Sequence, residues 1–182
     1  AASKGDYAAV STLLKYFDVN AHGPGCETAL MYSLGSHVPE VTQLLLDNGA
    51  KLEARDKNGN TALARAATHS YDGLMTAGQC LLDAGADINT RNDQGITPLM
   101  AATDTDCIQT ARDMIDRGAD IHATNNLGQT AADIARRKGR TDFADFLEIT
   151  ATTFAFQEAA EKGTPQKRQI RRKALKKKPL VP

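Results

Sequence analysis

The chain has 182 residues, of which 41% are hydrophobic and only 5% aromatic, and it contains no tryptophan. This length suits a single domain or a domain with an extension, with a core built from many small aliphatic contacts. No apolar run approaches the length of a membrane span and no signal peptide is visible, so we expect no membrane partner.

The net charge of zero divides into two opposed blocks. Residues 1–150 carry 13 Lys and Arg against 20 Asp and Glu, a net charge of −7. Residues 151–182 carry 9 against 2, a net charge of +7. This asymmetry predicts an acidic folded body followed by a basic arm.

The three cysteines, Cys26, Cys80 and Cys107, are odd in number and lack the paired spacing of a disulfide framework or a zinc site. Each lies within or beside a segment of apolar positions. We therefore expect buried free thiols and a reducing intracellular compartment.

Residues 1–21 are predicted to be the second half of a helical pair. The stretch 1–6 fits the end of a first helix and its turn, and the following helix is expected to bury Val10, Leu13 and Leu14. Tyr16 and Phe17 stand where a closing glycine is usual, so this helix should end irregularly.

Two sets of residues recur along the rest of the chain with the same period. Threonines that can cap a following helix are separated by 33, 36 and 33 residues, and glycines that can close a helix by 36 and 33. The threonines are Thr28, Thr61, Thr97 and Thr130, and the glycines are Gly49, Gly85 and Gly118. The clearest unit is 92–124, where Pro98 occupies the first turn of its helix.

Each unit departs from this pattern in its own way. In 22–55, Cys26 replaces a turn glycine, and the helices are expected at 28–34 and 39–48. In 56–91, a three-residue expansion falls at 70–73, between the two helices. In 92–124, Asp106 is predicted to cap the second helix. In 125–149, the last helix is expected at 142 to about 148, as a terminal capping element.

This repeat resembles the ankyrin repeat. The residues that carry the resemblance are T-P-L at 97–99, L-L-L-D-N-G-A at 44–50, C-L-L-D-A-G-A-D at 80–87 and D-M-I-D-R-G-A-D at 113–120. The resemblance implies an all-α solenoid of stacked helix pairs with β-turn tips. Residues 1–149 would form the repeats, with a partial first repeat at 1–21, and residues 150–182 a C-terminal extension.

The chain lacks the histidine of the family's T-P-L-H motif. Met31, Ala64, Met100 and Asp133 stand in its place. Because that histidine joins neighbouring turns by hydrogen bonds, we expect a looser array than one built from consensus repeats.

No nucleophile elbow, phosphate-binding loop, zinc cluster or dinucleotide fingerprint is present, so we expect no catalysis, cofactor or metal. The family binds other proteins through a concave face formed by turn tips and first helices. Carrying those positions over predicts a protein-binding set. Its members are Arg55, Lys57, Asn58, Asn60, His69, Arg91, Asp93, Gln94, Ile96, Thr105, Thr124, Asn126, Leu127, Gln129 and Lys138. Ile96 and Leu127 are either apolar anchors or ordinary exposed aliphatics.

The basic arm has three interpretations: a solvated tail, a nuclear import signal at 176–179, or an arm that binds the phosphates of RNA or DNA, or another anionic surface. Its predicted nucleic-acid-binding residues are Lys167, Arg168, Arg171, Arg172, Lys173, Lys176, Lys177 and Lys178. Because aromatic stacking residues are absent, contact with the phosphate backbone would dominate over base recognition.

These features favour a non-catalytic scaffold subunit of a large ribonucleoprotein, ribosome-like and of mitochondrial type, with the arm on RNA. The alternative is a soluble cytosolic or nuclear adaptor whose arm is an import signal. The expected compartment is the mitochondrial matrix or the cytosol, or the nucleus under the alternative.

Overall fold

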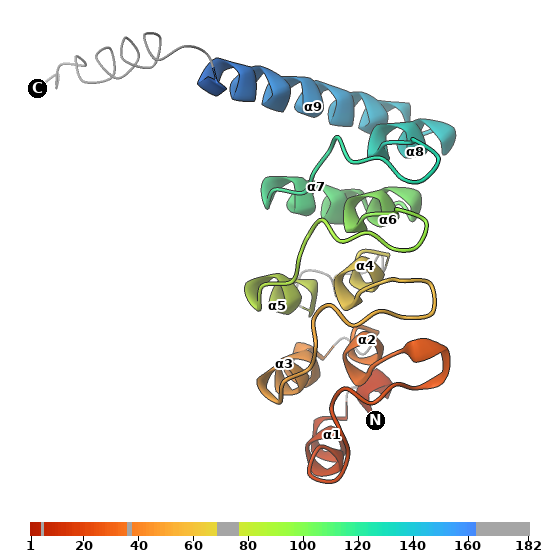
Figure 1. The fold of residues 1–182 in the computed structure, drawn as a ribbon, viewed down its shortest axis with the longest axis vertical. Helices are drawn as coiled ribbons and strands as arrows, with labels where there is room; N and C mark the ends of the chain where they lie inside the picture. Colours follow the sequence, from red (N-terminus) through yellow and green to blue (C-terminus); the bar gives the residue numbers. More distant parts are fainter. Residues whose placement is uncertain (5, 36–37, 69–76, 163–182) are drawn as a thin grey trace, which may run out of the picture.

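The computed structural model describes residues 1–4, 6–35, 38–68 and 77–162. Within these ranges the regular elements are helices, which stack along one axis from the N-terminal to the C-terminal end (Figure 1). An isolated bridge pairs His22 with Thr28. In chain order the elements are η1 (Ala2–Lys4), α1 (Tyr7–Leu13), η2 (Pro24–Cys26), α2 (Ala29–Ser33), α3 (Pro39–Asp47), α4 (Ala62–Ala66), α5 (Ala77–Asp83), α6 (Pro98–Asp104), α7 (Ile108–Asp116), α8 (Ala131–Arg137) and α9 (Thr141–Lys162).

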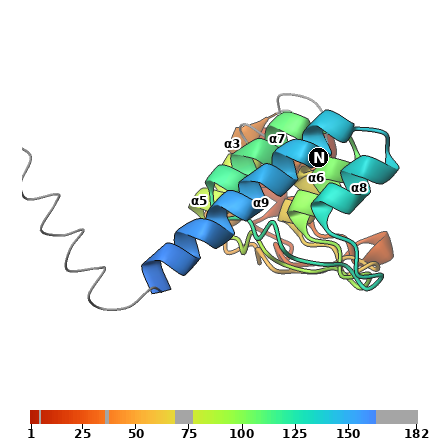
Figure 2. The same ribbon diagram turned by 90° about the horizontal axis from the view of Figure 1, so that it is seen from above.

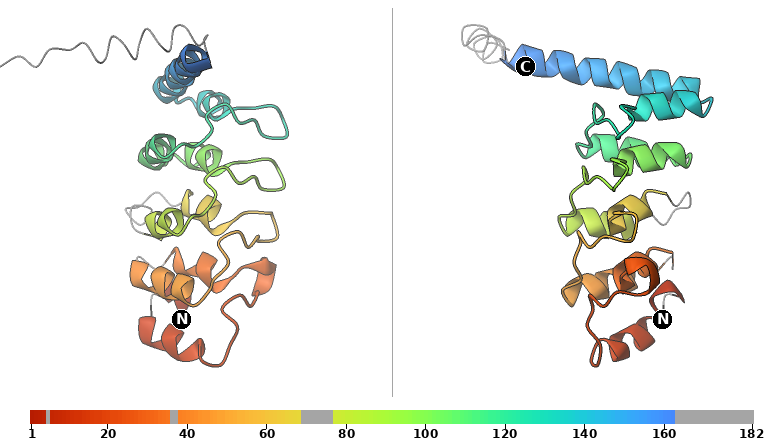
Figure 3. Two further views of the ribbon diagram at one scale, coloured as in Figure 1. Left: turned by 60° about the vertical axis from the view of Figure 1, so that its left-hand side comes forward. Right: turned by 45° about the vertical axis from the view of Figure 1, so that its right-hand side comes forward.

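The stack has an inner row and an outer row of helices. The inner helices α2, α4, α6 and α8 pack on one another in that order, and each packs against the outer helix that follows it. The loops between the pairs all project from the side of the inner row (Figure 3). The predicted all-α solenoid is therefore confirmed.

Threonine caps start the inner helices, as the sequence indicated. The hydroxyl oxygens of Thr28, Thr61, Thr97 and Thr130 each accept a hydrogen bond from the main-chain N–H three residues later. At the last of these, the Asp133 carboxylate also accepts from the Thr130 N–H at 2.9 Å, which completes a reciprocal capping box. Asp133 thus makes local hydrogen bonds at a position where the family has histidine.

The core repeats with the sequence. Leu30, Leu63 and Leu99 are buried at one position of successive inner helices. Leu45, Leu81, Met114 and Leu147 are buried at one position of successive outer helices. Each pair alone would expose this apolar face, so stacking is what removes it from water.

At the N-terminal end, α1 packs against α3, and Val10 is buried as predicted. The predicted burial of Leu13 was wrong, because α1 is the end helix of the described stack and 45% of Leu13 remains exposed. Tyr16 and Phe17 are also exposed, after a helix end that lacks the glycine found in later repeats.

Two local predictions were wrong. Asp106 does not cap α7: the N-cap residue is Cys107, without a side-chain hydrogen bond, and the Asp106 carboxylate lies 2.8 Å from Nε of Arg140 in the next repeat. The last helix does not end near residue 148, because α9 continues to Lys162 and projects beyond α8 (Figure 2). Residues 149–162 contain neither Gly nor Pro, so nothing in them stops the helix.

The cysteine prediction holds in part. Cys107 is buried and Cys80 is half-buried, but Cys26 is exposed on a loop. Cys26 occupies the position of the turn glycine and has φ of 61°. The expansion at 70–73 and the basic arm after Lys162 lie outside the described residues.

We predict that Cys26→Gly stabilises the protein. A residue with a Cβ in the left-handed region costs about 1 kcal/mol, and glycine removes that cost. The free energy of unfolding, measured by urea denaturation, should rise by about that amount. Cys26→Ala is the matched control, since it removes the thiol but keeps the Cβ and should bring no comparable gain. Equal stabilisation by both variants would contradict the prediction.

Candidate protein-binding surface

Three successive loops are built on the same hydrogen bonds. In each, one side-chain Oδ1 atom accepts from the main-chain N–H groups two and four residues later, at 2.9–3.0 Å. The accepting residues are Asp56, Asn92 and Asn125. Such short polar side chains favour turns because they satisfy the nearby backbone donors themselves.

The first two of these loops require glycine for two reasons at once. Gly59 and Gly95 have φ of 77° and 74°. A Cβ added to Gly59 would lie 2.8 Å from the Asp93 nitrogen, and one added to Gly95 would lie 2.9 Å from the Asn126 nitrogen. The backbone of each loop therefore approaches the next loop too closely for any side chain.

Main-chain hydrogen bonds join the loops into a ladder. The N–H of Lys57 donates to Gly25 at 2.8 Å. In the next two steps, Asp93 donates to Asn58 at 3.2 Å and Asn126 donates to Gln94 at 3.0 Å. Figure 3 shows the loops stacked one above another along the array.

Two arginines strengthen this ladder. Arg55 donates to the carbonyl oxygen of Arg91 at 2.7 Å, and Arg91 donates to that of Thr124. All three were predicted to bind a partner, and the structure gives each of them a contact within the array. They do not line the groove described next.

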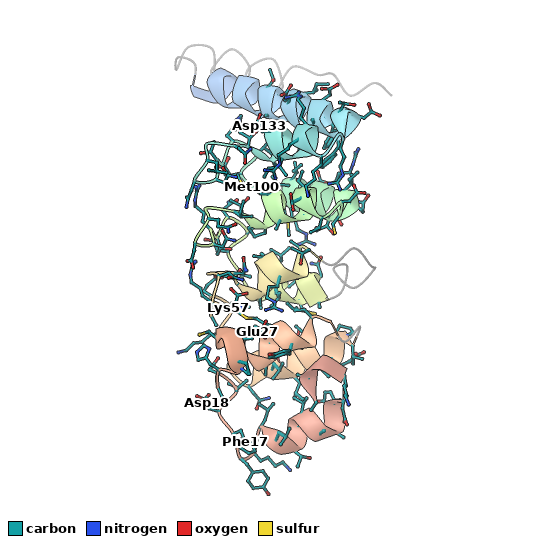
Figure 4. The ribbon with its side chains drawn as sticks, turned by 90° about the vertical axis from the view of Figure 1, so that its right-hand side faces the viewer. Phe17, Asp18, Glu27, Lys57, Met100 and Asp133 are labelled. Atoms are coloured by element: carbon teal, nitrogen blue, oxygen red, sulfur yellow. The ribbon has the colours of Figure 1, made fainter. Side chains whose placement is uncertain are left out.

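A groove of about 900 Å³ runs between the loops and the inner helices. Glu27, Lys57, Met100 and Asp133 lie one above another along this side of the array (Figure 4). Ten residues of the predicted protein-binding set line the groove. They are Lys57, Asn58, Asn60, Asp93, Gln94, Ile96, Thr105, Asn126, Leu127 and Gln129. Lys138 lies outside the groove lining, and His69 and all of the predicted nucleic-acid-binding residues lie outside the described residues.

The groove also contains residues that the sequence analysis did not select: Glu27, Asp56, Ala64, Arg65, Thr68, Asn92, Met100, Ala101, Asp104, Asn125, Ile134 and Arg137. One signal could have found three of them. Asp56, Asn92 and Asn125 recur with the spacings of 36 and 33 that the glycines show. Glu27 and Thr68 lie just outside the ends of α2 and α4, and the others come from inner helices, where only packing decides which side chains face the loops.

The two apolar tip residues differ. Leu127 is 79% exposed, whereas Ile96 is half-buried and packs against the core. Of these two tip residues, Leu127 therefore offers more apolar surface for a partner to bury.

Charged residues at the N-terminal end of the groove are paired across repeats. Arg65 contacts the Glu27 carboxylate and lies 3.5 Å from an Asp56 oxygen. A hydrogen bond from Tyr32, together with Arg65, lowers the pKa of the Glu27 carboxyl. Burial raises the pKa of Asp56, but hydrogen bonds from Asn60 and Asn58 and the charge of Arg65 outweigh burial, so its pKa lies below the ordinary value.

At the C-terminal end, Asp104 lies 3.1 Å from the Lys138 ammonium and 3.4 Å from Arg137. In the middle of the groove, by contrast, the Lys57 ammonium and the Asp93 carboxylate make no hydrogen bond or ion pair with any residue of the described ranges. These two groups remain available to a partner.

The family model for ankyrin repeats (3 copies) matches residues 1–90 and 70–152. The chain belongs to the ankyrin repeat family. Its period, threonine caps and loop ladder are therefore those of an ankyrin array, and arrays of this family mediate protein–protein interaction.

Relatives match parts of this array. A B-cell lymphoma 3 protein homolog from Mus musculus is 32% identical over 65% of the chain, which is 28% of the relative. Protein glp-1 from Caenorhabditis elegans is 30% identical over 68% of the chain and 10% of the relative. Protein phosphatase 1 regulatory subunit 12A from Mus musculus is 37% identical over 43% of the chain and 7% of the relative. The chain thus spans under a third of the length of each.

The described part of the chain offers no cluster of three or more metal-ligating side chains. Among the same residues, no helix combines the length and apolar character needed to cross a membrane.

We predict that Gly59→Ala destabilises the array more than Gly49→Ala. Both glycines have positive φ, but a Cβ at Gly49 meets nothing within 4 Å. Gly49→Ala should cost about 1 kcal/mol of unfolding free energy, and Gly59→Ala roughly 3 kcal/mol, because overpacking adds to the backbone strain. Urea denaturation of both variants measures the difference. Equal losses would show that the close approach between loops carries no energetic weight.

Proposed function

We propose that this protein is a non-catalytic scaffold that binds a protein partner in the groove between its loops and inner helices. The observation that carries the proposal is the combination, in one groove, of an exposed Leu127 with Lys57 and Asp93, whose charged groups have no partner among the described residues. Binding energy at protein interfaces concentrates in a few anchors surrounded by polar groups that set specificity. Leu127 serves as the anchor, and the two charges select the partner's orientation.

The family supports this class of function. One relative is by its name a regulatory subunit of a phosphatase, a protein that acts through another protein. In the present chain, most polar loop residues make hydrogen bonds within or between the loops. The side chains of Lys57, Asn58, Asp93 and Gln94 are left facing the groove.

A photo-crosslinking experiment tests the groove. A photoreactive amino acid replaces Gln94 in the groove, and the matched control replaces Gln109, which is exposed on α7 of the outer row. We expect a crosslinked partner at position 94 and none at 109, with a loss of about tenfold when Leu127→Lys is added. Circular dichroism confirms that the variants fold. Equal crosslinking at both positions, or no effect of Leu127→Lys, would refute the proposal.

A second function is favoured by the charge of residues 151–182, which carry a net +7 next to a body of −7. We propose that this arm contacts RNA, so that the scaffold is a subunit of a ribonucleoprotein of mitochondrial ribosomal type. The free thiols of the described chain are compatible with a reducing compartment such as the mitochondrial matrix or the cytosol. An import signal in a nuclear or cytosolic adaptor is the competing role of the same arm.

Deletion of residues 166–182 separates the two roles of the arm. If the arm binds RNA, deletion abolishes co-sedimentation with the particle, and binding of the intact chain weakens steeply as salt rises. If the arm is an import signal, co-sedimentation is unchanged and nuclear import is lost. Salt-independent association of the intact chain would contradict RNA binding.

A further inference from the structure

The ladder between the loops has a direction. Each loop accepts through a carbonyl oxygen, at Gly25, Asn58 and Gln94, from an N–H group of the following loop. Between the last two loops there is a second hydrogen bond, in which the carbonyl oxygen of Asp93 accepts from Nδ2 of Asn126 at 2.9 Å. By the repeat spacing, the corresponding acceptors on the final loop are the carbonyl oxygens of Leu127 and Asn126.

Those two carbonyl oxygens have no donor within the described part of the chain. Helix α9 packs against α8 in the last repeat, but it does not lie over the last loop (Figure 3). The side chain next to them, Leu127, is the most exposed large hydrophobic of the described residues. Among the described residues, the ladder therefore ends in an open edge with an apolar side chain beside it.

The chemistry of this edge restricts what can bind there. Both free groups are acceptors, so a second copy placed edge to edge would oppose acceptor to acceptor. A second copy placed head to tail through its loop at 22–28 would present Pro24 at the position of Lys57, Asp93 and Asn126, and proline has no N–H to donate. The fitting occupant is an extended segment of another protein, since its main-chain N–H groups are donors.

We propose that this open edge, formed by the carbonyl oxygens of Asn126 and Leu127 and the Leu127 side chain, binds an extended segment of a partner protein and so continues the ladder. The inference deepens the proposed scaffold function and rests on it, because Leu127 also lines the groove. It adds that the partner is held by main-chain hydrogen bonds at the C-terminal end of the groove.

A synthetic peptide with the sequence of residues 119–130 tests the edge, because its Asn126 offers the same N–H groups that the chain uses one repeat earlier. The peptide is added to the full chain labelled with ¹⁵N, and amide shifts are followed by NMR. We expect saturable shifts at residues 125–129, with a Kd in the millimolar range for so small a contact. Methylation of the peptide's Asn126 nitrogen removes the donor and should weaken binding about five- to tenfold.

Two results would overturn the proposal: no shifts at residues 125–129, or equal binding of the methylated peptide. Leu127→Lys keeps the carbonyl oxygens but removes the apolar contact, so it should weaken the peptide and leave the circular dichroism unchanged. The crosslink at position 94 reports the groove separately. If the peptide shifts residues 125–129 but no partner crosslinks at position 94, the scaffold function is refuted and the peptide-binding edge is not. If a partner crosslinks at position 94 but the peptide causes no shifts, only the proposal for the edge is refuted.

Discussion

The hydrogen bonds between successive loops are the interaction on which the rest of this structure depends. One side-chain oxygen in each loop, from Asp56, Asn92 or Asn125, accepts two main-chain N–H groups and so fixes the loop's shape. The fixed shape brings a glycine against the backbone of the next loop. Because each repeat contacts only its neighbours, this local geometry sets the stacking of the helices throughout the array.

The same constraint decides which side chains are free to function. Arg55 and Arg91 project from the loops, but their guanidinium groups are engaged by carbonyl oxygens of the next repeat. Lys57 and Asp93 each lie two positions further along than these arginines, where the ladder uses only the backbone, and their side chains face the groove. The side chains available to a partner are therefore those that the hydrogen bonds between loops do not use.

The two ends of the described stack differ. Toward its N-terminal side, Pro24 presents no N–H group at the ladder position of Lys57, and Tyr16 and Phe17 are exposed after α1. At the C-terminal end, the capping box at Asp133 and the long helix α9 close the helical core, while the last loop keeps its acceptors and Leu127 uncovered. Helix α8 of the last repeat is thus covered by α9, whereas the last loop is not. This difference leaves the edge at which we propose that an extended segment of a partner binds.

The sequence alone determined the period, the threonine caps, the closing glycines and ten of the groove-lining residues, because each depends on a residue's own backbone preference or on exact repetition. It did not determine the role of Asp106, since a capping side chain and an ion-pairing one look alike until Arg140 is brought beside it. Nor could it separate the arginines of the ladder from Lys57, whose ammonium group has no partner among the described residues, or the half-buried Ile96 from the exposed Leu127. Those distinctions depend on contacts between residues about 33 positions apart, and only the stacked structure decides them.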